Sequence, residues 1–122
     1  MSWWEGYYKD ADKLDVEKVS AWYAPNIELH FSGSEPAHGK AVATEAFRQF
    51  TAGMAQMKHT FGVTVAKDDE VFLDTTFSCR LKNGKEVTAK MGTYLRRENG
   101  LIRDMRGYGD LSPVMAAMAS EN

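Results

Sequence analysis

Apolar side chains recur at helical spacing along the first part of the chain. Trp3, Trp4, Tyr7 and Tyr8 fall on one side of a helix and predict a short first helix that ends before the polar run 9–13. So large an aromatic face is stable only when it is buried. The first helix is therefore expected to pack against the rest of the fold.

A second helix is expected after Asp15, whose carboxylate can cap it. This helix should stop at Ala24, because the proline that follows disfavours helical geometry in the residue before it. Its apolar side chains are Val16, Val19, Trp22 and Tyr23. A first strand then follows over residues 27–31.

The longest predicted helix begins after a loop over residues 33–36 and Gly39. One apolar stripe at helical spacing identifies it, made of Val42, Ala43, Ala46, Phe47, Phe50, Met54 and Met57. This stripe is the best helical pattern in the chain.

The spacing of apolar residues changes to two from His59 onward, which indicates strands. Phe61, Val63 and Val65 alternate with threonine and glycine, and residues 71–81 alternate in the same way. His59 shares a face with these apolar residues, so we expect it to point inward near the rim of a cavity.

Turn signals divide this second region into four consecutive antiparallel strands. They lie at 67–69, Asn83-Gly84 and Asn99-Gly100. Ser112 then caps a short final helix, with Pro113 at its first position. Helices followed by consecutive strands predict an α+β domain in which helices cover one face of a curved sheet and leave a conical cavity.

Composition narrows the class of protein. The 122 residues predict one domain, 1–122, and a formal net charge of -2 gives no basic footprint for nucleic acid. No apolar stretch is long enough to span a membrane, and Cys79 is the only cysteine, so we expect a soluble, cytoplasmic protein without disulfides. No metal site is predicted, because no usual ligand spacing is found among His30, His38, His59 and Cys79.

This order of elements resembles the NTF2-like superfamily, which includes ketosteroid isomerases, SnoaL-type polyketide cyclases, scytalone dehydratases and limonene epoxide hydrolases. The resemblance favours the SnoaL-like branch and implies a cone: a curved antiparallel sheet wrapped around a long helix, with two N-terminal helices. The residues that carry it are Trp22-Tyr23-Ala24-Pro25-Asn26, Gly33-Ser34-Glu35-Pro36 with Gly39, Asn99-Gly100-Leu101-Ile102, Tyr108 and Asp110-Leu111-Ser112-Pro113.

The resemblance to ketosteroid isomerases implies a partial catalytic site. That chemistry uses a carboxylate base together with a tyrosine and a protonated aspartate that hold the dienolate oxygen. Tyr7 matches the tyrosine, and Tyr23 matches a second tyrosine that supports it. The base position falls on His30 or Phe31, depending on where a one-residue gap is placed, and the aspartate position falls at about Gly92.

The resemblance to SnoaL-type cyclases implies an acidic base near the end of the last strand, for which Asp104 and Asp110 are the candidates. Asp104 and Arg106 share a strand face, so they can pair with each other or jointly hold a polar ligand group. The alternative for Asp110 is structural, because with Ser112 and Pro113 it can organise the turn into the last helix.

Two side chains have conflicting indications. Alternation with Ile27 and Leu29 turns His30 away from the core unless a bulge reverses it. The isomerase alignment turns Tyr94 toward the pocket, whereas alternation of the apolar residues along the strand turns it away. Two explanations remain open: the sheet is covered on both faces, or a bulge near Lys90 reverses the alternation. The full set of expected ligand-binding residues is Tyr23, Phe31, Phe47, His59, Tyr94, Met105 and Arg106.

Two functional hypotheses follow. The first is a SnoaL-like enzyme that performs cofactor-free isomerisation, cyclisation or dehydration on a small cyclic or polyketide-like ligand, with Tyr7 polarising a carbonyl and His30 or Asp104 moving the proton. The second is a non-catalytic ligand-binding or dimeric interaction module of the same fold. In either case we expect a homodimer that binds neither nucleic acid nor membrane.

Overall fold

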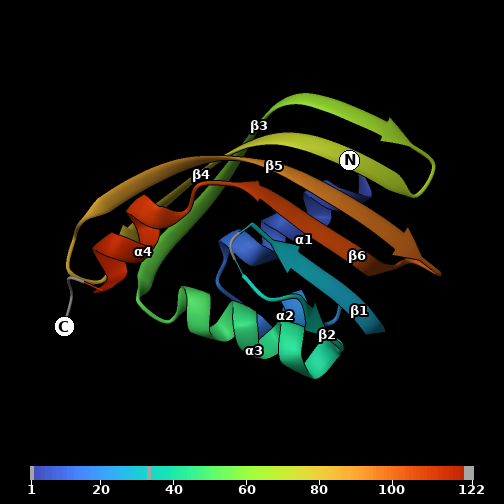
Figure 1. Ribbon diagram of the computed structural model, residues 1–122, viewed down its shortest axis with the longest axis horizontal. Helices are drawn as coiled ribbons and strands as arrows, with labels where there is room; N and C mark the ends of the chain where they lie inside the picture. The colour runs from blue at the N-terminus through green and yellow to red at the C-terminus, as the bar shows by residue number, and fades with distance from the viewer. Residues whose placement is uncertain (1, 33, 120–122) are drawn as a thin grey trace.

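The computed structural model describes residues 2–32 and 34–119. One sheet of six strands arches over three helices, with a fourth helix at one end (Figure 1). The strand order is β2-β1-β6-β5-β4-β3. In chain order the elements are α1 (Trp3–Asp12), α2 (Val16–Ser20), β1 (Tyr23–Phe31), β2 (Ala37–His38), α3 (Lys40–Thr51), β3 (Met54–Lys67), β4 (Glu70–Leu81), β5 (Glu86–Glu98), β6 (Leu101–Gly109) and α4 (Ser112–Ala119).

The four consecutive antiparallel strands are confirmed as β3 to β6. The turns lie where predicted, and both residues of Asn99-Gly100 have the positive φ of a tight hairpin turn, 54° and 79°. β1 joins this meander in parallel beside β6, and β2 closes the same edge. Gly33, which opens the predicted loop over 33–36, lies outside the described residues.

The prediction for the second helix was wrong at its C-terminal end. Asp15 caps the helix as expected by accepting a hydrogen bond from the backbone N–H of Lys18. The helix nevertheless ends at Ser20, because the carbonyl of Trp22 accepts the N–H of Ile102 and Tyr23 already pairs with β6. Pairing with a neighbouring strand therefore outweighs the helical spacing of the apolar residues.

The long helix is shorter than its apolar stripe predicted. α3 ends at Thr51, and the last two residues of the stripe, Met54 and Met57, belong to β3. Both are buried because the register of β3 shifts between Met54 and Gln56. A strand irregularity of this kind places residues three apart on one face, which imitates a helix.

The first helix is longer than predicted and runs through the polar segment to Asp12. Ala11 explains the extension, because it lies one turn after Tyr7 and is buried with it in the core. Leu14, with φ of 58°, then reverses the chain.

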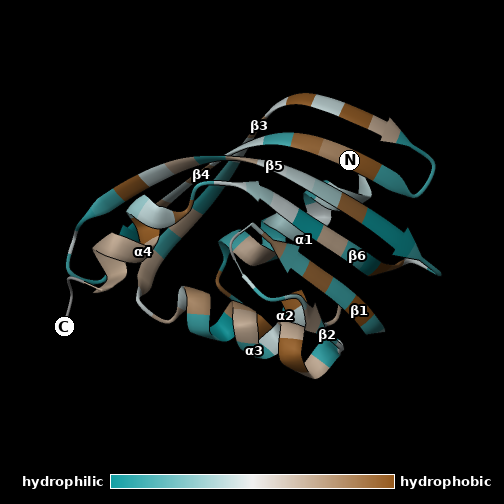
Figure 2. Cartoon of the chain, in the orientation of Figure 1, coloured by the Kyte–Doolittle hydropathy of each residue, from teal (hydrophilic) through white to brown (hydrophobic). Residues whose placement is uncertain are grey.

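The inner face of the arch carries the core. Hydrophobic and polar positions alternate along the strands (Figure 2). On β5 the pairing with β4 is continuous from Glu86 to Arg96, so there is no bulge near Lys90. Leu95 is fully buried while its neighbour Tyr94 lies on the outer face.

A bulge does occur on β6. Arg97 pairs with Ile102 and Arg96 pairs with Asp104, which leaves Arg103 as an extra residue. Ile102 and Met105 are consequently both buried in the core although they are three residues apart.

The division into two faces predicts unequal costs for the same substitution. Val71→Ala on β4 should lower the free energy of unfolding by about 2 kcal/mol, because Val71 is 1% exposed and its loss leaves a cavity. Val63→Ala on β3 is the control and should change it by less than about 0.5 kcal/mol, because Val63 is 72% exposed. Urea unfolding measures both, and equal effects would contradict this assignment of faces.

Candidate functional site

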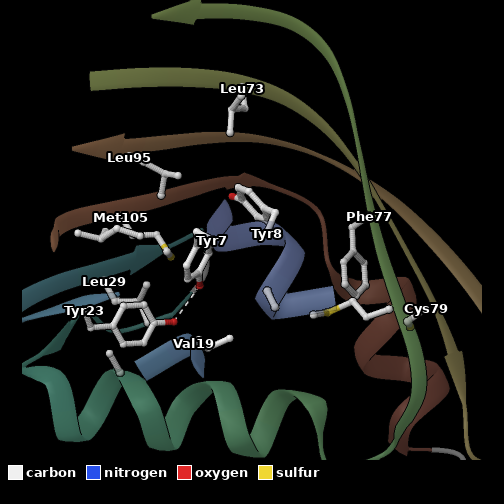
Figure 3. Close-up of a cluster of buried hydrophobic side chains, with 14 of the residues drawn as sticks. Tyr7, Tyr8, Val19, Tyr23, Leu29, Leu73, Phe77, Cys79, Leu95 and Met105 are labelled. Carbon is white, nitrogen blue, oxygen red and sulfur yellow. Dashed lines mark hydrogen bonds between the residues drawn. The ribbon is translucent and has the colours of Figure 1, made fainter. Parts of the chain in front are cut away.

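The centre of the cone is filled by tyrosines and aliphatic side chains. Tyr7 and Tyr23 are 4% and 2% exposed, and their hydroxyl oxygens are 2.9 Å apart in a hydrogen bond (Figure 3). Tyr8 is also buried and packs edge to face against Tyr7. The hydroxyl expected to polarise a ligand carbonyl is therefore paired inside the core with the tyrosine expected to support it.

Burial raises the pKa of all three phenols. It raises the pKa of Tyr23 to about 12, against the opposing effect of the hydrogen bond from Tyr7. Burial, followed by the proximity of Tyr23, raises the pKa of Tyr7 well above its ordinary value. Burial also raises the pKa of Tyr8, although a hydrogen bond with Thr93 lowers it in part. All three act as uncharged groups in the physiological range.

His30, Asp104 and Arg106 lie on the other side of the sheet. His30 on β1 pairs with Arg106 on β6, and Arg106 shares its face with Asp104. The pair next to them, Leu29 and Met105, points the opposite way and is buried in the core. The Nε2 atom of His30 is buried and has no hydrogen-bond partner within the described residues. The structure therefore does not bring His30 or Asp104 together with Tyr7.

Asp104 and Arg106 pair with each other. The Nε of Arg106 donates to one carboxylate oxygen of Asp104 at 3.0 Å, and its Nη2 donates to the other at 3.2 Å. These bonds hold the pKa of Arg106 above its ordinary value. With Phe72, Tyr94 and Tyr108 the pair lines an open depression of about 390 Å³ on the outer face.

Other positions implied by the resemblance have structural surroundings. Gly92 lies on the outer face, where a side chain would meet the ring of Phe72 at 2.8 Å. Hydrogen bonds with the side chain of Ser112 and with its backbone N–H lower the pKa of Asp110, which matches the structural alternative of a turn into α4. Phe31 and Phe47 are partly buried and pack against the core.

A second hollow, of about 270 Å³, lies between α1 and β3. His59 and Phe61 line it from β3, and the other lining residues come from one side of α1: Glu5, Tyr8, Lys9 and Asp12. His59 was expected at the rim of a cavity, and it is the one residue of the expected ligand-binding set that lines this hollow.

Asp12 holds His59 through both carboxylate oxygens. Oδ1 lies 2.5 Å from the ring Nδ1, and Oδ2 accepts the backbone N–H at 3.1 Å. The ring of His59 also packs against Tyr8 and Phe77, at centroid distances of 4.6 and 5.4 Å. Because Nδ1 is occupied by the carboxylate, Nε2 is the nitrogen left to exchange a proton with a ligand.

Asp12 was missed in the sequence, although one pattern points to it. It lies one helical turn after Tyr8, so both side chains occupy the same side of α1. The first helix was predicted to end before the polar run, and that error left Asp12 outside the helix. A longer helix would have aligned it with the aromatic face.

No set of three or more metal-ligating side chains gathers within residues 2–32 and 34–119. None of the helices in the same residues is both long and apolar enough to cross a membrane.

The family of the chain follows from comparison with known proteins. Residues 4–105 match the family model of the SnoaL-like domain. The chain therefore belongs to the SnoaL-like domain family. No curated protein matches it.

Solved structures share the fold at low sequence identity. A putative SnoaL-like polyketide cyclase from Shewanella denitrificans has a TM-score of 0.82 at 11% identity, with 97% of this chain and 95% of that chain covered. A hypothetical protein with a ketosteroid isomerase-like fold from Catenulispora acidiphila, in complex with trimethylamine, has a TM-score of 0.80 at 14% identity. The match covers 94% of this chain and 90% of that chain. TerC co-crystallised with polyporic acid has a TM-score of 0.75 at 15% identity, with 98% of this chain and 96% of that chain covered. These likenesses confirm the predicted NTF2-like α+β fold.

The buried tyrosines predict a loss of stability in alkali. A phenol whose pKa is raised in the folded state is charged first in the unfolded chain, so stability is complete below pH 10 and falls as the pH rises toward 12. Each such group should steepen the fall by about 1.4 kcal/mol per pH unit. Tyr23→Phe should make the fall shallower in urea unfolding between pH 9 and 12, and an unchanged slope would contradict the assignment.

Proposed function

We propose that this protein is a SnoaL-like enzyme of cofactor-free acid/base chemistry, with His59 as the proton carrier in the hollow between α1 and β3. The observation that carries the proposal is the pair formed by His59 and Asp12. The ligand is a small cyclic or polyketide-like molecule, and the reaction is an isomerisation, cyclisation or dehydration. Structural neighbours named for polyketide cyclisation and for polyporic acid support this substrate class.

The pair suits proton transfer at a carbon beside a carbonyl group. The Asp12 carboxylate accepts the Nδ1 proton of His59, which selects the tautomer with a lone pair on Nε2. When Nε2 takes a proton from the ligand, the imidazolium that forms lies against the Asp12 carboxylate and is stabilised by it. The same nitrogen can return the proton at another ligand atom, which completes an isomerisation without net consumption of acid or base.

The aromatic walls of the hollow suit a ring compound. Tyr8 and Phe61 pack edge to face at 5.1 Å, and both line the hollow. An apolar ring placed against them loses contact with water and gains contact with two π-systems. The ligand is thereby held within reach of His59.

Proton exchange on a model ketone tests the proposal. The protein should accelerate deuterium incorporation into 2-tetralone in D2O, followed by proton NMR. His59→Gln should reduce that acceleration by about 10² to 10⁴, because it removes the proton carrier, and Asp12→Asn should reduce it less. The exposed His38 provides the matched control, His38→Gln, which should leave the rate unchanged.

His30→Gln and Asp104→Asn extend the same experiment. If either abolishes exchange while His59→Gln does not, the assignment of the proton carrier is wrong. Each variant is first compared with the wild type by circular dichroism, so that loss of the fold is separated from loss of the reaction.

A second candidate function is a non-catalytic ligand-binding module. The filled centre of the cone favours it, because Tyr7 and Tyr23 are buried there and are hydrogen-bonded to each other. A wild-type protein that binds 2-tetralone without accelerating its exchange would support this candidate over the enzyme.

We also propose a homodimer, formed through the outer face of the sheet. This face has large apolar side chains in water, including Val65, Phe72 and Tyr108, which are 66%, 43% and 49% exposed. Asp104 and Arg106 on this face neutralise each other, which reduces the repulsion between two copies. A cytoplasmic location is proposed on the single cysteine, Cys79, which is buried.

Sedimentation tests the dimer. The wild type should sediment as a dimer at micromolar concentration, and Phe72→Lys should sediment as a monomer because it places a charge in the apolar centre of the contact. Val42→Lys on α3, at a position 52% exposed, is the control and should remain dimeric. A monomeric wild type would contradict the proposal.

A further inference from the structure

We infer that the hollow between α1 and β3 selects ring compounds that bear a negative charge, and that Lys9 is the residue that selects them. The inference rests on the proposed function, because it concerns the same hollow. It adds a ligand class that the pair of His59 and Asp12 does not define.

The argument starts from the charged groups that line the hollow, which are Glu5, Lys9 and Asp12, together with the titratable His59. Asp12 is committed, since both of its oxygens are bonded to His59. Its carboxylate oxygens are therefore bonded to His59 and not to a ligand. Glu5 and Lys9 remain, and they differ in whether their charged groups form a hydrogen bond within the protein.

Glu5 is drawn away from Lys9. A glutamate four residues before a lysine on a helix is the arrangement that normally forms an ion pair. Here Oε1 of Glu5 instead accepts the backbone N–H of Ser2 at 3.3 Å, at the N-terminus of α1. Glu5 thus stabilises the start of the helix and forms no ion pair with Lys9.

Lys9 is left without a partner. Its ammonium makes no ion pair or hydrogen bond within residues 2–32 and 34–119, although its side chain lines the hollow. Lys9 lies in the last turn of α1, where a cation also offsets the negative end of the helix dipole, and that role leaves its three N–H donors free. Among the charged side chains that line the hollow, Lys9 is therefore the one whose N–H donors are free for a ligand.

A ligand with an anionic group gains most from this arrangement. Its ring would lie against Tyr8 and Phe61, its carboxylate would accept hydrogen bonds from Lys9, and its acidic carbon would face His59. A neutral ligand of the same shape keeps the ring contacts but lacks the ion pair. The expected preference is modest, up to about fivefold, because Lys9 is exposed and water screens the interaction.

Two probes of equal size measure the preference. 2-Naphthoate and 2-naphthamide share a ring system and differ in charge. Their dissociation constants are obtained by NMR titration, in which the side-chain signals of His59 report occupancy of the hollow. We expect 2-naphthoate to bind up to about fivefold more tightly at low ionic strength, with the difference shrinking at 0.5 M salt.

Lys9→Met should remove the difference between the probes by weakening the binding of 2-naphthoate. Lys13→Met is the matched control, because Lys13 is an exposed lysine at the C-cap of the same helix that does not line the hollow, and it should preserve the difference. A difference that persists in Lys9→Met, or equal binding of both probes to the wild type, overturns the inference.

The proposed function fails in a distinguishable way. If neither probe shifts the signals of His59, the hollow is not a ligand site and both proposals fall. If both probes shift them equally, the hollow binds ligands and the inference about charge fails alone.

Discussion

The packing of α1 beneath the arch of the sheet is the contact on which the rest of the structure depends. Its buried side chains, Tyr7, Tyr8 and Ala11, fill the space that the curved strands enclose. The indole N–H of Trp22 donates to Asp10 at 2.9 Å, which ties the same helix to the start of β1. Because Tyr8 and Asp12 lie on one side of α1, the helix that completes the core also builds one wall of the candidate site. Core and site therefore cannot form independently.

The two faces of the sheet explain why residues expected in one site are separated. A strand sends neighbouring side chains to opposite faces, so Met105 enters the core while Asp104 and Arg106 lie on the outer face, where Asp104 is still only 7% exposed. Positions carried over from related enzymes are correct in chain order but sensitive to a shift of one residue. A single gap decides between His30 and Phe31, and these two side chains point in opposite directions.

Much of the fold follows from local patterns in the sequence. The tight turns at Asn83-Gly84 and Asn99-Gly100, the cap at Asp15 and the four consecutive strands depend on neighbouring residues only. The error at the end of α3 occurs at an irregular place in β3, where Met54 and Met57 imitate helical spacing. Such irregularities are set by pairing with distant strands and leave no local pattern. The contact of Asp12 with His59 joins residues 47 positions apart, which only the assembled fold brings together.

The centre of the cone is filled by side chains, among them the rings of Tyr7 and Tyr23. Main-chain atoms in that place would be costly to move, because each carries hydrogen-bonding groups that need partners. Rings can be exchanged for smaller side chains by single substitutions at Tyr7 or Tyr23. Such substitutions would leave a cavity inside the cone while the strands and helices keep their places, at a cost in stability that grows with the volume removed.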